Sequence, residues 1–183
     1  KSDNLILISN NINTTIQILE DIQINDKIEI ILGNEGILNQ KILDDIESNK
    51  VKKLTIVSSA YDTTNLAFKE WEKYANTIEI DSKGSYLPNA YDATFLLGLA
   101  IEKAGSTDLE KIAMSLREVA NSPGEKIYPG EWEKAKALIA SGDSIDYVGA
   151  SGKIEFDENG DVIGYYSINI ITDNNWKSVI IDQ

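Results

Sequence analysis

The chain has 183 residues, 42% of them hydrophobic, which is enough to bury the core of a folded domain. Its 30 Asp and Glu outnumber 17 Lys and Arg, and the net charge of -13 argues against binding to nucleic acid or anionic lipid. Because it contains no Cys and no His, it lacks thiol nucleophiles, imidazole bases and the usual zinc ligands. We therefore expect no cofactor and no metal site.

The first part of the chain alternates short apolar runs with helical patterns. The apolar runs predict strands at 5–8, 28–32 and 54–57, with amphipathic helices between them. Strands and helices that alternate at this spacing indicate βαβ units and a parallel sheet. Ligands of such sheets usually lie beyond the carboxyl ends of the strands, which here are followed by the loops 9–13 and 33–37.

The middle of the chain is mostly helical. Asn89 is a predicted cap for a helix over 90–104, which stops at Gly105. Further amphipathic patterns predict helices over 109–119 and 132–141. No internal repeat or flexible linker interrupts this region.

The end of the chain changes to strand patterns. Residues 154–156 and 162–171 predict a hairpin around the Asn159-Gly160 turn, and 176–181 predict a further strand.

The turn itself also suggests a calcium loop, because oxygen-bearing side chains alternate at Asp157, Asn159 and Asp161. However, the EF-hand loop with its terminal glutamate is not present, and the Asn-Gly pair is typical of a tight turn. We therefore favour a turn over a metal site.

A series of short motifs follows one another along the chain. They are Ile31-Leu32-Gly33-Asn34-Glu35-Gly36, Ala60-Tyr61-Asp62, Phe68-Lys69-Glu70-Trp71, Tyr91-Asp92-Ala93 and the stretch from Asp146 to Asp161. Each motif alone is weak, but their order and spacing resemble type I periplasmic binding proteins. Within that family, the chain is most similar to the branched-chain amino-acid receptors of ABC transporters.

This resemblance implies a three-layer α/β/α fold with a parallel sheet, in a protein of two lobes joined by crossing segments. Since members of the family are longer, it also implies that this chain is the C-terminal half and that the N-terminal half is missing. Residues 1–58 would then belong to the C-terminal lobe, and the mainly helical residues 59–150 would pack on the N-terminal lobe. Residues 151–183 would form the hairpin and the return segment across the hinge.

Glu35 is the first candidate site residue. In similar receptors a carboxylate in the matching Gly-x-Glu-Gly loop pairs with the α-ammonium group of the ligand, and the glycines let the backbone approach. A desolvated ammonium group needs such a charged acceptor. The alternative is an exposed glutamate in a turn.

Four further residues are candidate ligand contacts by the same resemblance. Asn11 lies in a loop where similar receptors often have an aromatic residue, so it suggests a more polar ligand, unless it only caps the next helix. Tyr61 follows the third strand and borders the hinge. Asn89 and Tyr91 open the helix that lies near the cleft in the family.

The resemblance predicts the solute-binding component of an ABC importer, in an extracytoplasmic, bacterial-type location. Its partners would be an amino acid or similar small ligand, the missing N-terminal half and the membrane permease. One alternative is a sensor domain of the same fold in a signalling receptor. Another is an enzyme that uses only carboxylates, such as a glycosidase, which needs two acidic side chains facing each other across a pocket.

Overall fold

The computed structural model describes residues 3–22, 28–46 and 53–181, so the outer limits of the predicted segments, residues 1 and 183, lie outside the described residues. The chain divides into two compact units. We call residues 1–60 with 166–182 unit 1, and residues 61–165 unit 2. Among the described residues, no helix combines the length and apolar character needed to cross a membrane.

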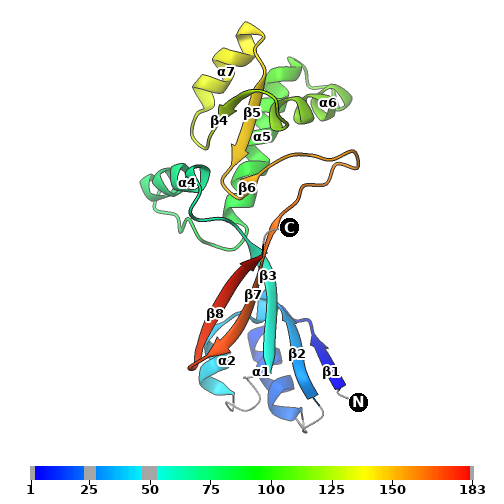
Figure 1. The fold of residues 1–183 in the computed structure, drawn as a ribbon, viewed down its shortest axis with the longest axis vertical. Helices are drawn as coiled ribbons and strands as arrows, with labels where there is room; N and C mark the ends of the chain where they lie inside the picture. Colours follow the sequence, from blue (N-terminus) through cyan, green and yellow to red (C-terminus); the bar gives the residue numbers. More distant parts are fainter. Residues whose placement is uncertain (1–2, 23–27, 47–52, 182–183) are drawn as a thin grey trace. The chain divides into compact units, whose positions relative to one another are not determined.

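Unit 1 is built on a sheet whose described strands follow the order β1-β2-β3-β7-β8 (Figure 1). Both pairs among β1, β2 and β3 are parallel, whereas β7 and β8 are antiparallel. This confirms the predicted α/β fold with a parallel sheet. The elements are β1 (Asp3–Leu7), α1 (Ile12–Asp21), β2 (Ile28–Asn34), the 3-10 helix η1 (Glu35–Ile37), α2 (Gln40–Asp45), β3 (Leu54–Ala60), β7 (Tyr165–Thr172) and β8 (Asn175–Ile181).

The core of unit 1 lies between the sheet and the helices α1 and α2, which share one side of the sheet in Figure 1. Strand side chains alternate between the two faces of a sheet, so one set of strand residues meets the apolar stripes of the helices. The buried members are Leu7, Ile31, Leu54 and Ile56 from the strands, Ile37 from η1, Ile16, Leu19, Ile42 and Leu43 from the helices, and Ile46 at the end of α2.

Unit 2 consists of helices around a small sheet of order β4-β5-β6 (Figure 1). Its elements are α4 (Leu66–Thr77), α5 (Leu87–Ala104), α6 (Leu109–Ala120), β4 (Glu125–Ile127), α7 (Trp132–Ser141), β5 (Ile145–Gly149) and β6 (Gly152–Lys153). Leu99 of α5, Val119 of α6 and Tyr147 of β5 are fully buried in its core. Unit 2 therefore buries the apolar residues Ile145 and Tyr147 of its central strand β5 among helices α5, α6 and α7.

The predicted cap at Asn89 is wrong. Helix α5 begins at Leu87, with Pro88 in its first turn, and the residue before it, Tyr86, has a left-handed backbone with φ 59°. Proline suits this position because the first helical N–H groups have no partner within the helix. Asn89 therefore lies inside the first turn, exposed to solvent. The predicted stop at Gly105 is confirmed, since this residue ends the helix with φ 53°.

The predicted hairpin around Asn159-Gly160 is also wrong. The turn forms, but Asp157 closes it, because its carboxylate accepts hydrogen bonds from the N–H groups of Asn159 and Asp161, both at 2.9 Å. Residues 154–156 are not a strand. Instead β7 pairs with β8 around Asp173 and Asn174, whose positive φ values are typical of hairpin turns that match the twist of the strands.

Candidate ligand-binding site

The carboxyl ends of β1, β2 and β3 lie at one edge of the unit 1 sheet, because these neighbouring strands are parallel. Each end carries polar residues. Ser9 and Asn11 follow β1, Asn34 and Glu35 end β2 and begin η1, and Ser59 lies near the end of β3. This edge is the usual position of ligands in parallel α/β folds.

Glu35 is held in place by the neighbouring strand. Its Oε2 atom accepts hydrogen bonds from the backbone N–H and the hydroxyl of Ser59, both at 3.2 Å. The side chain is partly buried, so it keeps some contact with solvent. A carboxylate with two fixed donors on one oxygen retains acceptor capacity on the other.

Two residues beside Glu35 join its loop to the loop after β1. The Asn34 side-chain oxygen accepts a hydrogen bond from the backbone N–H of Ser9 at 2.9 Å. A Cβ atom at Gly36 would lie 2.4 Å from the backbone oxygen of Ser9, so only glycine fits this close approach. The loops that carry Glu35 and Asn11 are therefore neighbours.

Asn11 is exposed and caps α1. Its side-chain oxygen accepts a hydrogen bond from the backbone N–H of Thr14 at 3.0 Å, which satisfies one of the free donors at the start of the helix. The capping role considered from the sequence is thus confirmed. A contact between Asn11 and a ligand stays a prediction.

A buried polar network fixes the strand that carries Ser59. The hydroxyls of Ser58 and Ser167 lie 2.8 Å apart, and the amide of Asn169 donates to Ser58 Oγ at 3.0 Å and to the Ile56 carbonyl at 3.2 Å. Ser178 of β8 donates to the Asn169 carbonyl oxygen. The network joins β3, β7 and β8 next to the position where Ser59 holds Glu35.

The predicted residue Tyr61 belongs to unit 2. Its ring stacks on that of Phe68 with centroids 5.3 Å apart, and its hydroxyl donates to the Lys83 carbonyl. Burial, with the Asp81 charge nearby, raises the pKa of Tyr61.

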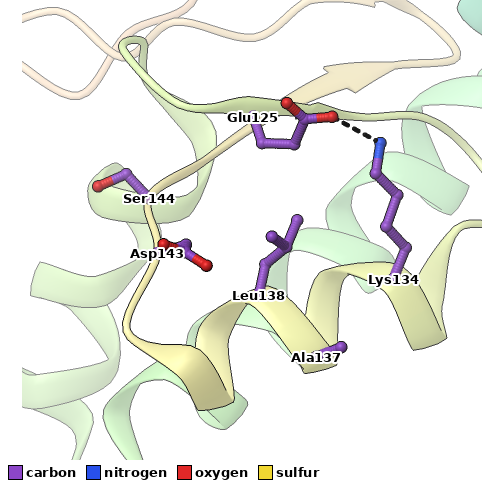
Figure 2. Close-up of a pocket in the computed structure, with 6 residues that line it drawn as sticks. All are labelled: Glu125, Lys134, Ala137, Leu138, Asp143 and Ser144. Atoms are coloured by element: carbon purple, nitrogen blue, oxygen red, sulfur yellow. Dashed lines mark ion pairs between the residues drawn. The ribbon is translucent and has the colours of Figure 1, made fainter.

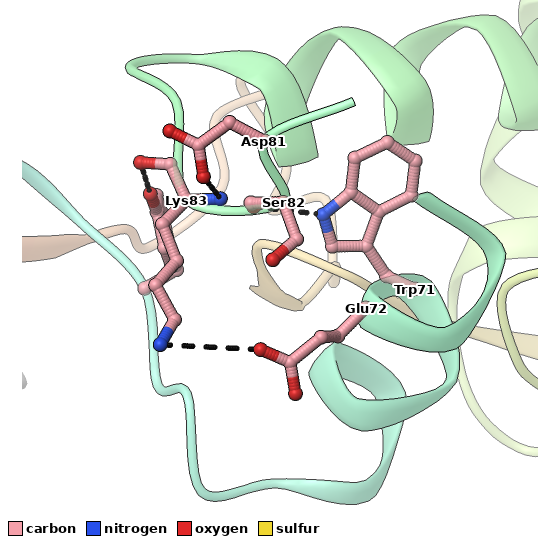
Figure 3. A network of polar contacts seen from close by, with 6 residues as sticks. Trp71, Glu72, Asp81, Ser82 and Lys83 are labelled. Atoms are coloured by element: carbon pink, nitrogen blue, oxygen red, sulfur yellow. Dashed lines mark hydrogen bonds and ion pairs between the residues drawn. The ribbon is translucent and has the colours of Figure 1, made fainter. Parts of the chain in front are cut away.

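Figure 3 shows how the loop that accepts this hydrogen bond is itself fixed. The Trp71 indole N–H donates to the Ser82 carbonyl at 2.9 Å, and Asp81 accepts from the Lys83 N–H at 3.0 Å. Lys83 also pairs with Glu72 at 3.9 Å. The Tyr61 hydroxyl therefore serves the packing of this loop.

Tyr91 and Asn89 also belong to unit 2, on α5. The Tyr91 ring lies 4.7 Å from that of Trp71 between centroids, and its hydroxyl accepts a hydrogen bond from Gly130 N–H at 2.8 Å. Burial raises the pKa of Tyr91. Tyr61 and Tyr91 pack against the same buried cluster around Phe68 and Trp71, whereas Asn89 is exposed.

Comparison with known proteins identifies the family of the chain. The family described as "Receptor family ligand binding region" matches residues 23–174. The chain belongs to this family.

Solved structures give the same fold for this receptor-family region. The leucine-binding protein LivK from Thermotoga maritima has a TM-score of 0.60 at 23% identity, over 98% of this chain and 44% of that protein. LivJ from Streptococcus pneumoniae, a branched-chain amino acid transporter substrate-binding protein solved with isoleucine, has a TM-score of 0.58 at 13% identity, over 99% and 45%. These matches confirm the type I periplasmic-binding-protein fold.

A curated relative is the chemotactic signal transduction system substrate-binding protein BasB of Halobacterium salinarum. It is 32% identical over 88 residues, which is 48% of this chain and 21% of BasB. The chain thus spans less than half the length of each of these relatives.

Two residues that organise the receptor-family region are not evident from the sequence patterns. Ser59 was not singled out, although it lies at a strand end where a parallel sheet places its ligands.

Asp92 was noted only as part of a motif. It is 2% exposed, and its carboxylate accepts from the Tyr147 hydroxyl and Ala150 N–H, both at 2.7 Å, and from the N–H and hydroxyl of Ser151 at 2.8 and 2.6 Å. Burial raises the pKa of Asp92 against the opposing effect of these donors. The signal for Asp92 in the sequence was a single acidic residue within a largely apolar predicted helix.

A surface hollow of about 540 Å³ in unit 2 contains none of the predicted site residues. Figure 2 shows its lining from β4, α7 and the turn after α7, namely Glu125, Lys134, Ala137, Leu138, Asp143 and Ser144. Lys134 is paired with Glu125 at 3.1 Å and with Glu131 at 3.6 Å, so its charge is already balanced. Polar groups from several strands converge instead at the Glu35 edge, which is the candidate ligand site.

The acidic residues 157–161 form a turn in which the Asp157 carboxylate accepts backbone hydrogen bonds. Hydrogen bonds from backbone N–H groups, that of Asp161 first, lower the pKa of the Asp157 carboxyl. Within the part of the chain that the structure describes, no group of three or more acidic side chains is placed to hold a metal ion.

Proposed function

We propose that this chain forms part of the binding site for an amino acid or a related small polar solute, in the extracytoplasmic solute-binding component of an ABC importer. Membership of a ligand-binding receptor family supports this proposal, as do the similar leucine-binding and branched-chain amino acid proteins. The matched family and these proteins are named for binding, which favours a receptor over a carboxylate-only hydrolase.

The observation that carries the proposal is the geometry of Glu35. Ser59 orients the carboxylate from the adjacent strand, and the close approach at Gly36 brings the loop after β1 beside it. An ammonium group desolvated at this strand edge requires a charged acceptor, and the loss of such a partner costs roughly 2–5 kcal/mol of binding free energy. Glu35 is therefore the proposed partner of the α-ammonium group.

The other candidate residues have different proposed roles. Asn11 keeps its cap and offers its amide N–H groups to polar atoms of the ligand. The hydroxyls of Tyr61 and Tyr91 are engaged within unit 2, so these residues would offer ring surface to the ligand. Asn89 would contribute its exposed side-chain amide.

In the complete protein we propose that two lobes close on the solute and that the closed form binds the membrane permease. The chain carries Glu35 but spans only 44–45% of the similar solved proteins. By itself it would supply only part of the site, so we expect the 183-residue chain to bind solute weakly.

Thermal unfolding in the presence of each standard amino acid tests this proposal. The chain is compared with a longer version that includes its natural flanking coding sequence. A ligand at about 100 times its dissociation constant adds about 2.7 kcal/mol of stability to the form that binds it. We expect this stabilisation in the longer protein, its loss in Glu35→Gln and its retention in the exposed control Glu133→Gln. Equal stabilisation of wild type and Glu35→Gln would contradict the role of Glu35.

A sensory role is the second candidate, and it rests on the similarity to BasB, whose name places it in chemotactic signal transduction. Deletion of the gene separates the two functions. Loss of uptake of the labelled amino acid supports the importer. Loss of chemotaxis towards the same amino acid, with normal uptake, supports the sensor.

A further inference from the structure

Ser59 binds one oxygen of the Glu35 carboxylate with two donors. The parallel pairing of β2 with β3 is described as far as Asn34 beside Val57, and Ser59 lies two residues beyond that pair. Its backbone N–H and its hydroxyl both donate to Oε2 of Glu35, at 3.2 Å each. The Glu35 side chain is therefore attached to β3 through Oε2.

The backbone on either side of Glu35 is fixed as well. The Asn34 side chain accepts a hydrogen bond from the Ser9 N–H, and Gly36 approaches the Ser9 carbonyl closely. Glu35 also begins η1, where its carbonyl accepts a hydrogen bond from the Leu38 N–H at 2.9 Å. The carboxylate is thus held with one oxygen against β3, and the other is left for a ligand.

That second oxygen, Oε1, has no hydrogen-bond donor among the residues that the structure describes. A carboxylate has about four lone-pair positions, about two on each oxygen. The two bonds from Ser59 occupy those of Oε2, so those of Oε1 remain. Glu35 therefore offers a single oxygen to a cationic ligand.

Cationic groups differ in how many carboxylate oxygens they use. A guanidinium group binds a carboxylate best as a planar fork, with parallel N–H bonds to both oxygens. An ammonium group is a compact charge, and its N–H groups can be accepted by one oxygen. A carboxylate with one oxygen already occupied therefore favours an ammonium group over a guanidinium group.

We infer that Ser59 is a positioning residue that makes the Glu35 site selective for solutes with an ammonium group over solutes with a guanidinium group. The inference rests on the proposed function, because it requires Glu35 to be the partner of the solute's cationic group. It adds the class of cation that the site accepts and the residue that sets this class. Ser59 acts through the Glu35 carboxylate.

The preference between the two cations can be measured with a pair of related solutes. The protein extended by its natural flanking coding sequence is screened with the standard amino acids by thermal unfolding. The amino acid that stabilises it most is then compared, by calorimetry, with its counterpart in which a guanidinium group replaces the α-ammonium group. We expect wild type to bind the amino acid more tightly, and the preference is the ratio of the two dissociation constants.

Substitution of Ser59 should reduce this ratio. Ser59→Ala removes the hydroxyl donor and frees a position on Oε2, which gives the guanidinium group its second acceptor. We expect the preference for the amino acid to fall about tenfold, the size of one further hydrogen bond to a charged group. A merely structural role of Ser59 would weaken both solutes alike and leave the ratio unchanged.

Two more variants separate the hydroxyl from the volume of the side chain. Ser59→Cys keeps nearly the same volume but donates weakly, so it should lower the ratio as Ser59→Ala does, and it replaces that variant if the alanine form unfolds. Ser59→Thr keeps a hydroxyl and should keep the ratio of wild type. Ser141→Ala, which removes an exposed hydroxyl at the end of α7, is the control and should not change the ratio.

Variants of Ser59 and Glu35 together distinguish failure of the inference from failure of the proposed function. If Glu35→Gln loses affinity for the amino acid but Ser59→Ala and Ser59→Cys keep the ratio of wild type, the inference is overturned and the proposed function stands. Equal affinity of wild type for the two solutes would also overturn the inference. If Glu35→Gln binds the amino acid as tightly as wild type, or if no standard amino acid stabilises wild type, the proposed function fails and the inference fails with it.

Discussion

The two units differ in how far they bury the apolar residues of their sheets. Unit 2 surrounds its central strand with α5, α6 and α7 and anchors the end of that strand on the buried carboxylate of Asp92. Unit 1 covers one face of its sheet and leaves the other apolar and exposed. A compact unit can therefore bury its helices well and still leave one face of its sheet exposed. Unit 2 buries Ile145 and Tyr147 of β5 in its core, whereas unit 1 leaves the second face of its sheet exposed.

The largest expected effect is in unit 2. Asp92→Leu removes the acceptor of the Tyr147 hydroxyl and of the Ala150 and Ser151 N–H groups, and buried donors without partners cost about 1–3 kcal/mol each. We expect a loss of about 3 kcal/mol or more in the free energy of unfolding, measured by urea titration of tryptophan fluorescence. The exposed variant Glu133→Gln should change it little. If Asp92→Leu also left the free energy of unfolding almost unchanged, this would contradict the proposed role of Asp92 in holding the end of β5.

Two neighbouring residues of β2, Ile31 and Leu32, test the difference between the two faces of the unit 1 sheet. Ile31 is 0% exposed and Leu32 is 38% exposed, on opposite faces of the same strand. We expect Ile31→Ala to cost about 2–5 kcal/mol, as for deletions in a packed core. Leu32→Ala should cost less than about 1 kcal/mol in the chain alone. Similar losses of unfolding free energy for both variants would mean that the second face is not open.

The polar network of unit 1 should give a smaller effect. Asn169→Leu leaves the Ser178 hydroxyl and the other network hydroxyls with fewer partners, at a cost of about 1–3 kcal/mol. Fluorescence of Trp176, which lies on β8 in unit 1, reports this change when the other two tryptophans are replaced by phenylalanine. Asn89→Leu, at an exposed position of unit 2, is the control. Unchanged stability of unit 1 would argue that the network is not needed to fix β3.

The pH dependence gives the smallest expected effect, and its sign differs between two carboxyls of unit 2. The folded state raises the pKa of Asp92, so its contribution to stability is present below the ordinary aspartate pKa and is lost as pH rises through the folded pKa. The pKa of Asp157 is lowered, so its contribution is present above the ordinary pKa and is lost as pH falls. The difference in unfolding free energy between wild type and Asp92→Asn should therefore decrease with rising pH, and for Asp157→Asn it should increase. Denaturant titrations across the acidic range measure both, and parallel trends would contradict these assignments.

Local signals in the sequence were sufficient for much of the fold. The apolar periodicity predicted β1, β2 and β3 and the helices between them, and the end of α5 at Gly105 followed from glycine's tolerance of a left-handed backbone. The start of α5 was missed because Tyr86 adopts that backbone without being glycine, while Pro88 favours an earlier start than the Asn89 cap suggested.

The candidate site was only partly predictable because its supports are distant in sequence. Glu35 could be singled out from its loop, but Ser59 is 24 residues away and becomes its donor only when β2 and β3 pair. Asp92 and Tyr147 are 55 residues apart. The exposed face of unit 1 was likewise hidden, because apolar strand residues look the same whether or not the chain supplies their cover.

The proposed interaction between Glu35 and the ligand's ammonium group can be measured directly. Calorimetry on the form of the protein that binds solute would compare an amino acid with its analogue lacking the ammonium group, in wild type and in Glu35→Gln. We expect wild type to prefer the amino acid by roughly 2–5 kcal/mol and Glu35→Gln to lose most of this preference. An equal preference in both proteins would show that another residue binds the ammonium group.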